Sequence, residues 1–335
     1  MRRAFKAVVL ILAALTTIAA GLLGWLFVAF DSHGPLAETR AVVIPRGSSA
    51  EDIGKLLTDR GVISSPLVFS LGVRLSGKSS ALRSGEYAFA AATSARAAMD
   101  LIISGRTVVR RLTLPEGWTT AQALQLVATA EGLEGPVTLK PDEGALLPET
   151  YNYSWGDSRD AMVRRMTRAM DETLADLWSK RPTDSPMTSP REALILASIV
   201  ERETGIAEER GRVASVMVNR LKRGMRLQSD PTVAYGAALA ASAPLHLLTR
   251  PLTRDDLQKA TPYNTYIIDG LPPAPIANPG RAALRAAIDP PRTDFLYFVA
   301  DGSGGHAFAR SLDEHNRNVA RWRALERARD TAPPR

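Results

Sequence analysis

The sequence predicts an α+β protein with an N-terminal transmembrane helix, a small subdomain of strands and helices, and a larger mixed α/β domain with a helical core. Three observations support this fold class. Residues 7–30 form an uncharged apolar run. Two strand–turn–helix patterns follow, at residues 41–57 and 108–127. Beyond residue 157 the apolar spacing is mainly helical. Short strand–helix units followed by a mainly helical stretch indicate the α+β class.

The first element is the apolar run of residues 7–30, which follows three basic residues and ends at Asp31. About 20 apolar residues cross a bilayer as a helix, and short basic flanks stay in the cytoplasm. A cleaved signal peptide is the alternative, but its apolar region usually has about 7–15 residues. We therefore predict a single-pass anchor in the inner (cytoplasmic) membrane. Residues 1–6 would be cytoplasmic, and residues 31–39 would be a linker to a periplasmic, extracytoplasmic body.

The composition excludes several kinds of site. The chain has no cysteine, so thiol nucleophiles and cysteine zinc sites are absent. Its four histidines show no metal-ligand spacing, and we predict no metal and no cofactor. The net charge of +7 comes from basic residues spread along the chain without a nucleic-acid motif, so we expect no nucleic-acid partner. We interpret these charges as solvated faces; attraction to anionic envelope polymers or lipid headgroups is the alternative.

The small subdomain begins with a predicted strand at residues 41–44 and a turn. Ser48 is the expected helix N-cap, with Glu51 completing a capping box. The second pattern has a strand at residues 108–114 and a helix capped by Thr119 or Thr120. Between the two patterns, the sequence predicts two helices and one strand, at residues 67–75, 95–103 and 86–90.

The larger domain begins with helical patterns. Met162, Met166 and Met170 recur at helical spacing, which indicates a core stripe rather than a binding surface. After a break at residues 182–189, Ser189 caps a helix with proline at its first position, predicted to end near residue 203. A helix at residues 207–222 follows. The C-terminal third is predicted to hold loops, one hairpin at residues 295–309 and a last charged helix from residue 313.

The helix that ends near residue 203 has an acidic end, VERET, on an apolar body. A carboxylate is expensive to bury, so the pattern has two interpretations. Either the helix end frays into solvent, or one carboxyl group is a catalytic acid that its apolar surroundings keep protonated. Periodicity does not choose between Glu201 and Glu203, which do not face each other on a helix. A second acid, if one is needed, would come from elsewhere, and Asp230 is the candidate.

Several blocks of sequence resemble the endolytic murein transglycosylases, also called the YceG-like or MltG family. They agree in order and spacing over nearly the whole chain. The blocks are residues 143–151 (EGALLPETY), 196–204 (LASIVERET), 213–221 (VASVMVNRL), 225–236 (MRLQSDPTVAYG), 262–266 (PYNTY), 270–280 (GLPPAPIANPG), 296–300 (LYFVA) and 304–308 (GGHAF). The resemblance implies a LysM-like subdomain at residues 40–106, a catalytic domain at residues 107–327 and a C-terminal tail at residues 328–335.

The resemblance also implies a reaction. Family members cleave the β-1,4 bond between N-acetylmuramic acid and N-acetylglucosamine inside peptidoglycan glycan strands, without water, and leave 1,6-anhydro ends. The residue that matches the catalytic glutamate is Glu201. It would first protonate the glycosidic oxygen and then take the proton of the muramic C6 hydroxyl. The acid role requires a protonated Glu201 near neutral pH. We expect this from its apolar helix, with the neighbouring Arg202 directed away.

The remaining blocks are predicted to line a substrate cleft. Amide and hydroxyl groups suit acetamido sugars, tyrosine rings can stack on pyranose faces, and for each residue a structural role is the alternative. Asp230 precedes a proline and either fixes a loop or gives electrostatic support. The predicted substrate-binding residues are Asn219, Gln228, Ser229, Asp230, Tyr235, Tyr263, Asn264, Thr265 and Tyr266.

Two other functions are compatible with the sequence. A membrane-anchored peptidoglycan-binding scaffold would need no catalytic acid. A hydrolytic muramidase would use Glu201 with Asp230 as a pair of carboxylates. The family resemblance favours the lytic transglycosylase. It also implies that the enzyme terminates the elongation of nascent strands beside penicillin-binding proteins of the cell-wall synthesis machinery.

Overall fold

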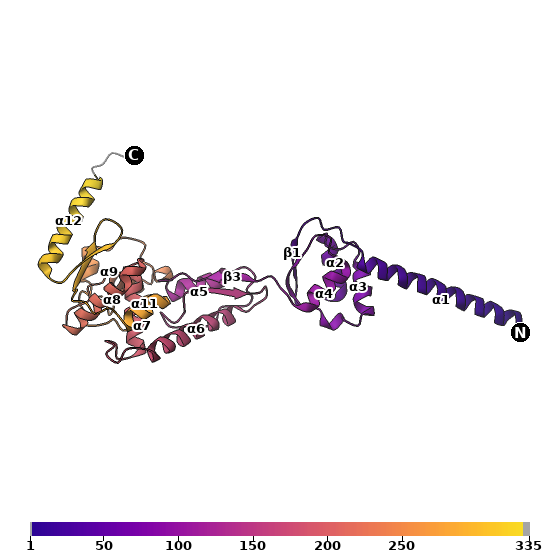
Figure 1. The fold of residues 1–335 in the computed structure, drawn as a ribbon, viewed down its shortest axis with the longest axis horizontal. Helices are drawn as coiled ribbons and strands as arrows, with labels where there is room; N and C mark the ends of the chain where they lie inside the picture. The colour runs from indigo at the N-terminus through magenta and orange to yellow at the C-terminus, as the bar shows by residue number, and fades with distance from the viewer. Residues whose placement is uncertain (1, 331–335) are drawn as a thin grey trace. The chain divides into compact units, whose positions relative to one another are not determined.

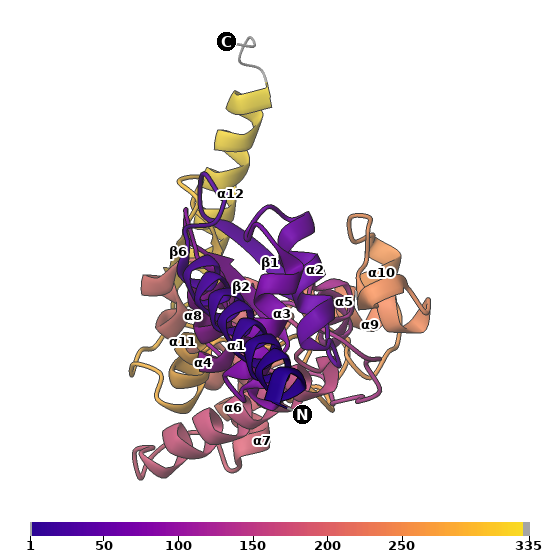
Figure 2. The same cartoon turned by 90° about the vertical axis from the view of Figure 1, so that its right-hand side faces the viewer.

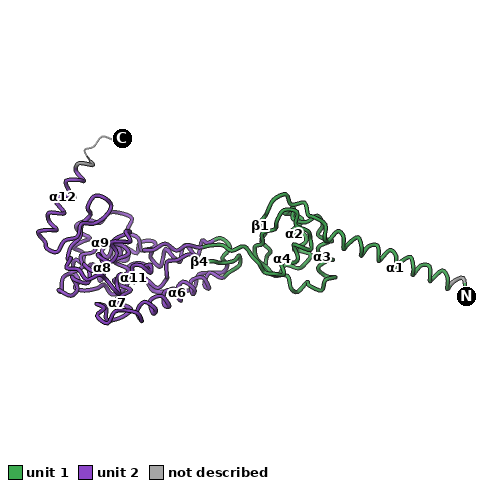
Figure 3. Tube along the Cα trace, viewed as in Figure 1, with its two compact units in different colours: residues 1–111, 131–133, 152–157 green, residues 112–130, 134–151, 158–335 purple. Residues whose placement is uncertain are grey.

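The computed structural model describes residues 2–330 and divides the chain into two units (Figure 3). Unit 1 comprises the chain up to residue 111 together with residues 131–133 and 152–157. Unit 2 comprises residues 112–130, 134–151 and the chain from residue 158 onward. Of the predicted C-terminal tail, residues 328–330 belong to the last helix and residues 331–335 lie outside the described part.

The apolar run forms one helix, α1 (Arg2–Asp31), within unit 1. Its segment Phe5–Asp31 is long and apolar enough to cross a membrane, a property that signal sequences share. The end of the helix packs on α3 and α4. There Leu26 and Phe30 are buried in the core of unit 1, and the ring of Phe30 lies where a side chain on Gly72 would be. This end of α1 is therefore part of a folded core.

The rest of unit 1 is built on an antiparallel pair of strands, in which Val42 lies opposite Tyr87. The strands and helices share one core through residues such as Ile44, Leu57 and Phe89. These elements are β1 (Arg40–Ile44), α2 (Ala50–Asp59), α3 (Pro66–Leu75), the 3₁₀ turn η1 (Ser79–Ala81), β2 (Gly85–Phe89) and α4 (Ala95–Ser104).

One capping prediction in unit 1 was wrong by one residue. The N-cap of α2 is Ser49, and Asp52 completes the capping box, instead of Ser48 with Glu51. The sequence SSAED contains the same hydroxyl-x-x-acid pattern in two registers, and only the packing of the helix distinguishes them.

Most elements of unit 2 are helices (Figure 1). The strands β3 (Arg110–Thr113) and β4 (Thr150–Tyr153) pair with each other, and each has residues in both units, whereas β5 (Tyr297–Ala300) and β6 (His306–Ala309) form an antiparallel hairpin within unit 2. The helices are α5 (Thr120–Thr129), α6 (Arg159–Ser179), α7 (Pro190–Glu203), α8 (Ala207–Lys222), α9 (Asp230–Ala240), η2 (Pro244–His246), α10 (Arg254–Gln258), α11 (Arg281–Ile288) and α12 (Leu312–Asp330).

Helix α7 is the central helix of unit 2 and packs against α6, α8, α9 and α11. The predicted N-cap Ser189 accepts from the backbone N–H of Glu192, which confirms the predicted start. The run from Ile195 to Glu201 is buried throughout. The predicted methionine stripe of α6 is also core, since Met162, Met166 and Met170 are fully buried. The mixed α/β class with a helical core is thus confirmed.

The C-terminal third is more helical than predicted, because α9, α10 and α11 lie in the stretch expected to be mainly loops. The predicted hairpin is confirmed as β5 and β6. Helix α12 packs on this hairpin and projects away from the helical core of unit 2 (Figures 1 and 2).

Candidate active site

Glu201 lies in the last turn of α7, where the apolar body of the helix ends. Its side chain is only 3% exposed. The Glu201 Oε1 atom accepts from the Nη2 atom of Arg210 at 3.1 Å, and Oε2 accepts from the backbone N–H of Gly280 at 2.8 Å. One turn earlier, the Ser198 hydroxyl accepts from the N–H of Ile276 at 3.0 Å and thereby fixes the segment that leads to Gly280. The carboxyl group is therefore held from two sides.

Arg210 connects Glu201 to a second carboxylate. It lies in the first turns of α8, and its Nη2 atom also donates to Glu116 Oε2 at 3.2 Å. Glu116 comes from the turn before α5, and its side chain is 44% exposed. Glu116 lies between the predicted strand at residues 108–114 and the helix that follows, and it was not among the predicted site residues. No local signal connects position 116 with position 201, because the contact arises from tertiary packing.

Two glycines allow this close approach. A Cβ atom at Gly280 would lie 1.8 Å from Glu116 Oε1, so Glu116 occupies the space that a side chain would fill. Gly117 has φ +75 and lies beside both Glu201 and Arg202. The guanidinium of Arg202 donates to the carbonyl of Gly117 at 3.2 Å. Among the described ion pairs, Glu201 is joined to Arg210.

The environment of Glu201 differs from the one expected. An apolar surrounding was predicted to keep the carboxyl group neutral. Instead, the carboxylate receives a guanidinium and a backbone N–H, and both contacts stabilise its negative charge. The site is therefore suited to a group that is ionised during part of its cycle.

Glu203, the other acidic residue of this helix end, lies in a separate cluster. Its carboxyl group accepts a hydrogen bond from the hydroxyl of Ser229, which is 1% exposed. Tyr266 donates to Asp230 Oδ1 at 2.6 Å in the same cluster. Part of the Glu203 side chain reaches solvent, yet burial of its carboxyl group raises its pKa to about 7, with a contribution from the Asp230 charge. Asp230 thus lies near Glu203, and the hydrogen-bond partner of Asp230 is Tyr266.

Asn264 and Thr265 are 0% exposed and bonded within the protein. The Asn264 amide donates to the carbonyls of Leu257 and Lys259, which ends α10. The Thr265 hydroxyl accepts from the N–H of Ser229 at 2.9 Å. In this structure both side chains hold the loop that carries the Glu203 cluster.

Tyr235 and Tyr263 form a third group, with ring centroids 5.0 Å apart in an edge-on arrangement. Tyr235 is buried and donates to Glu143 Oε2 at 3.0 Å, whereas Tyr263 is half-buried. Glu143 also accepts from the backbone N–H of Thr120, the first residue of α5. This group joins the 143–151 block to α9 and α5.

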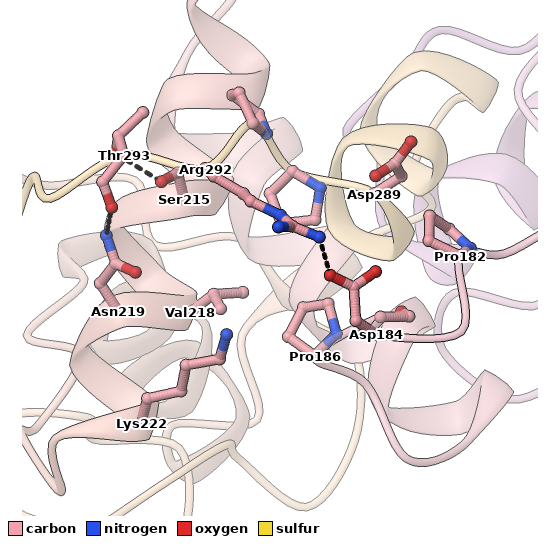
Figure 4. Close-up of a pocket in the computed structure, with 13 residues that line it drawn as sticks. Pro182, Asp184, Pro186, Ser215, Val218, Asn219, Lys222, Asp289, Arg292 and Thr293 are labelled. Carbon is pink, nitrogen blue, oxygen red and sulfur yellow. Dashed lines mark hydrogen bonds and ion pairs between the residues drawn. The ribbon is translucent and has the colours of Figure 1, made fainter.

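Gln228 and Asn219 complete the predicted residues. Gln228 is exposed, has φ 51 and accepts from Arg220 at 3.3 Å beside the Glu203 cluster. Asn219 lines a different cavity of about 590 Å³, where its amide donates to the carbonyl of Thr293 at 2.7 Å (Figure 4). Arg292 and Asp184 form an ion pair in the same cavity. Asn219 lies nine residues beyond Arg210 on α8, about 13 Å along the helix axis.

Comparisons with known proteins show which family the chain resembles. A family model described as the YceG-like family matches residues 42–321. The endolytic murein transglycosylase of Bacillus subtilis is 30% identical over 306 residues, which are 82% of this chain and 82% of that protein. The endolytic murein transglycosylase of Streptococcus pneumoniae is 28% identical over 349 residues, and the match spans 90% of this chain and 62% of that longer protein.

A solved structure is also similar. It is a putative yceG-like protein from Listeria monocytogenes, with a TM-score of 0.52 and 30% identity, and the match covers 84% of this chain and 98% of that chain. The sequence match, the fold and the predicted blocks therefore agree, and the resemblance inferred from those blocks is confirmed. The chain belongs to the YceG-like family.

Proposed function

We propose that this protein is an endolytic lytic transglycosylase of peptidoglycan. It cleaves the β-1,4 bond between N-acetylmuramic acid and N-acetylglucosamine inside glycan strands and leaves 1,6-anhydro ends. Its family and the names of its relatives support this activity. The observation on which the proposal mainly rests is the buried Glu201 carboxyl group, held between the Arg210 guanidinium and the Gly280 N–H.

The proposed reaction uses Glu201 twice. The protonated carboxyl group donates its proton to the glycosidic oxygen, and the bond from C1 of the muramic residue to that oxygen breaks. The acetamido group of the substrate stabilises the positive charge at C1. Glu201, now a carboxylate, removes the proton of the C6 hydroxyl, whose oxygen bonds to C1. The carboxyl group regains its proton and no water is consumed. Arg210 and Gly280 stabilise the intermediate carboxylate.

The proposal places the enzyme on the outer face of the inner membrane, anchored by α1. Leu26 and Phe30 belong to the core of unit 1, which supports a helix that is retained rather than cleaved. The segment before them, residues 5–25, is about 30 Å long as a helix and matches the hydrocarbon thickness of a bilayer. Residues 40–106 would form the LysM-like subdomain. Termination of nascent strands beside penicillin-binding proteins is the proposed role.

Product analysis tests this function. The full-length protein in detergent is incubated with purified sacculi, and the released muropeptides are identified by mass spectrometry. We expect 1,6-anhydro products from the wild type and a loss of at least about a hundredfold in Glu201→Gln, which keeps the shape but has no acid. Glu208→Gln, an exposed glutamate on α8, is the matched control and should stay fully active.

The same experiment separates the two other functions. Products heavier by one water would identify a hydrolytic muramidase, and binding without products would identify a scaffold. The muramidase would need a second carboxylate to activate water, and Asp230 is bonded to Tyr266 beside Glu203. Full activity of Glu201→Gln would overturn the assignment of the acid.

A further inference from the structure

The site contains one guanidinium between two carboxyl groups. Glu116 Oε2 and Glu201 Oε1 both lie within 3.2 Å of Arg210 Nη2. If both carboxyl groups were ionised, one negative charge of this half-buried group would have no cation. Burial and the charge of Glu201 raise the pKa of Glu116, against the effect of Arg210. The group is therefore suited to hold one proton on either carboxyl, with Arg210 paired to the other.

The geometry of Arg210 agrees with two alternative pairings. A single nitrogen, Nη2, makes both carboxylate contacts. Within the described residues, Arg210 Nε is buried and has no hydrogen-bond partner. A guanidinium that pairs with one carboxylate in the usual bidentate manner uses two of its nitrogens. The contacts within the described residues therefore leave Nε unused, which is consistent with a guanidinium shared between two carboxyl groups.

We propose that Glu116 is the second carboxyl group of the active site and acts as a positioning residue through Arg210. It holds the guanidinium while Glu201 carries its proton, and it releases the guanidinium to Glu201 once that proton has passed to the glycosidic oxygen. This inference rests on the proposed function of Glu201. It explains how one glutamate can be an acid and then a base beside the same arginine.

Other charged groups near α7 are engaged elsewhere. On α7 itself, Arg202 donates to the carbonyl of Gly117. The charged residues of α6 between positions 164 and 176 are exposed. On the remaining neighbours, Arg281 of α11 bonds to Glu149, Tyr266 bonds to Asp230 of α9, and His306 bonds to Glu209 of α8. The charged group in direct contact with Glu201 is therefore Arg210, which also contacts Glu116.

The pH dependence of anhydro-muropeptide release by the full-length protein tests the inference. Glu116→Gln removes the carboxylate that competes with Glu201 for Arg210. Arg210 then stabilises the Glu201 carboxylate alone, so Glu201 loses its proton at a lower pH. We expect the alkaline limb of the kcat/KM profile to move to a lower pH by about one unit. At pH values above the limb kcat/KM should fall about tenfold, and at pH values below it kcat/KM should change little. Arg210→Gln should move the same limb upward, and Glu116→Asp should restore most of the wild-type profile.

Controls distinguish this result from damage to the fold. Glu131→Gln removes an exposed carboxylate that also pairs with an arginine, Arg110, and its profile should match the wild type. A Glu116→Gln profile that is lowered equally at every pH, or is unchanged, would refute the role of Glu116. If Glu116→Gln melts at a lower temperature than the wild type, Arg210→Gln decides whether the inference holds. An upward shift of its alkaline limb supports the role of Glu116, and no such shift refutes it. If the wild type releases no anhydro products at all, the proposed function fails instead.

Discussion

Glu203, at the end of α7, should make the protein less stable as the pH rises. The pKa of Glu203 is raised from its ordinary value of 4.5 to about 7, first by burial. Below about pH 4.5 the carboxyl is protonated in both the folded and unfolded chain, so stability is unaffected. Between these values the unfolded chain loses the proton and the folded chain keeps it, so the unfolding free energy falls with pH. Above about pH 7 the full loss is reached.

The size of this loss follows from the shift. One pKa unit corresponds to about 1.4 kcal/mol, so the shift of Glu203 corresponds to a loss on the order of 3 kcal/mol. Glu203→Gln removes the titration and keeps a group that can accept from Ser229. The unfolding free energy of the variant, relative to the wild type, should therefore increase by this amount between pH 4.5 and pH 8.

Urea denaturation of the full-length protein in detergent, followed by tryptophan fluorescence at a series of pH values, measures this difference. Trp178 reports on unit 2, since it packs against the core of that unit. Glu208→Gln, which changes an exposed glutamate, is the control and should show no such trend. If wild type and Glu203→Gln differ by the same free energy at pH 4.5 and pH 8, Glu203 is not titrating in a buried state and the reasoning is wrong.

Three further changes have defined outcomes. Gly280→Ala would place a methyl group 1.8 Å from Glu116 Oε1 and displace that carboxylate, so the alkaline limb of anhydro-product release should move down by about one pH unit, as in Glu116→Gln. Asn264→Ala leaves buried carbonyls without donors and should reduce the unfolding free energy by about 3 kcal/mol in urea. Ser198→Ala leaves the N–H of Ile276 without its acceptor; we expect a loss of about 1–3 kcal/mol by the same measurement.

The helices that contain the site could be predicted closely because their signals are local. Ser189 and the proline after it define the start of α7, and the helix at residues 207–222 was predicted with the bounds that α8 has. Local signals failed where they were short or ambiguous. The strand β4 has only four residues, and α9 begins at an Asp-Pro pair that also suits a loop.

The site itself could be predicted only in part. The family resemblance selected Glu201, but its partners come from other parts of the chain. Arg210 is an ordinary charged residue in the helical pattern of α8, and Glu116 is an ordinary turn residue. The sequence does not show that Arg210 Nη2 lies within 3.2 Å of both Glu116 Oε2 and Glu201 Oε1. These distances depend on how α7, α8 and the turn before α5 pack. The same packing determines that Asp230 meets Glu203.

Asn278 connects the segments that build the Glu201 site. Its side chain accepts from the N–H of Leu146 and donates to the carbonyl of Trp118, and its own carbonyl accepts from the N–H of Gly117. The Glu201 carboxyl group thus depends on stretches of chain from position 116 to position 280. During synthesis the site would therefore stay incomplete until residue 280 had emerged and docked.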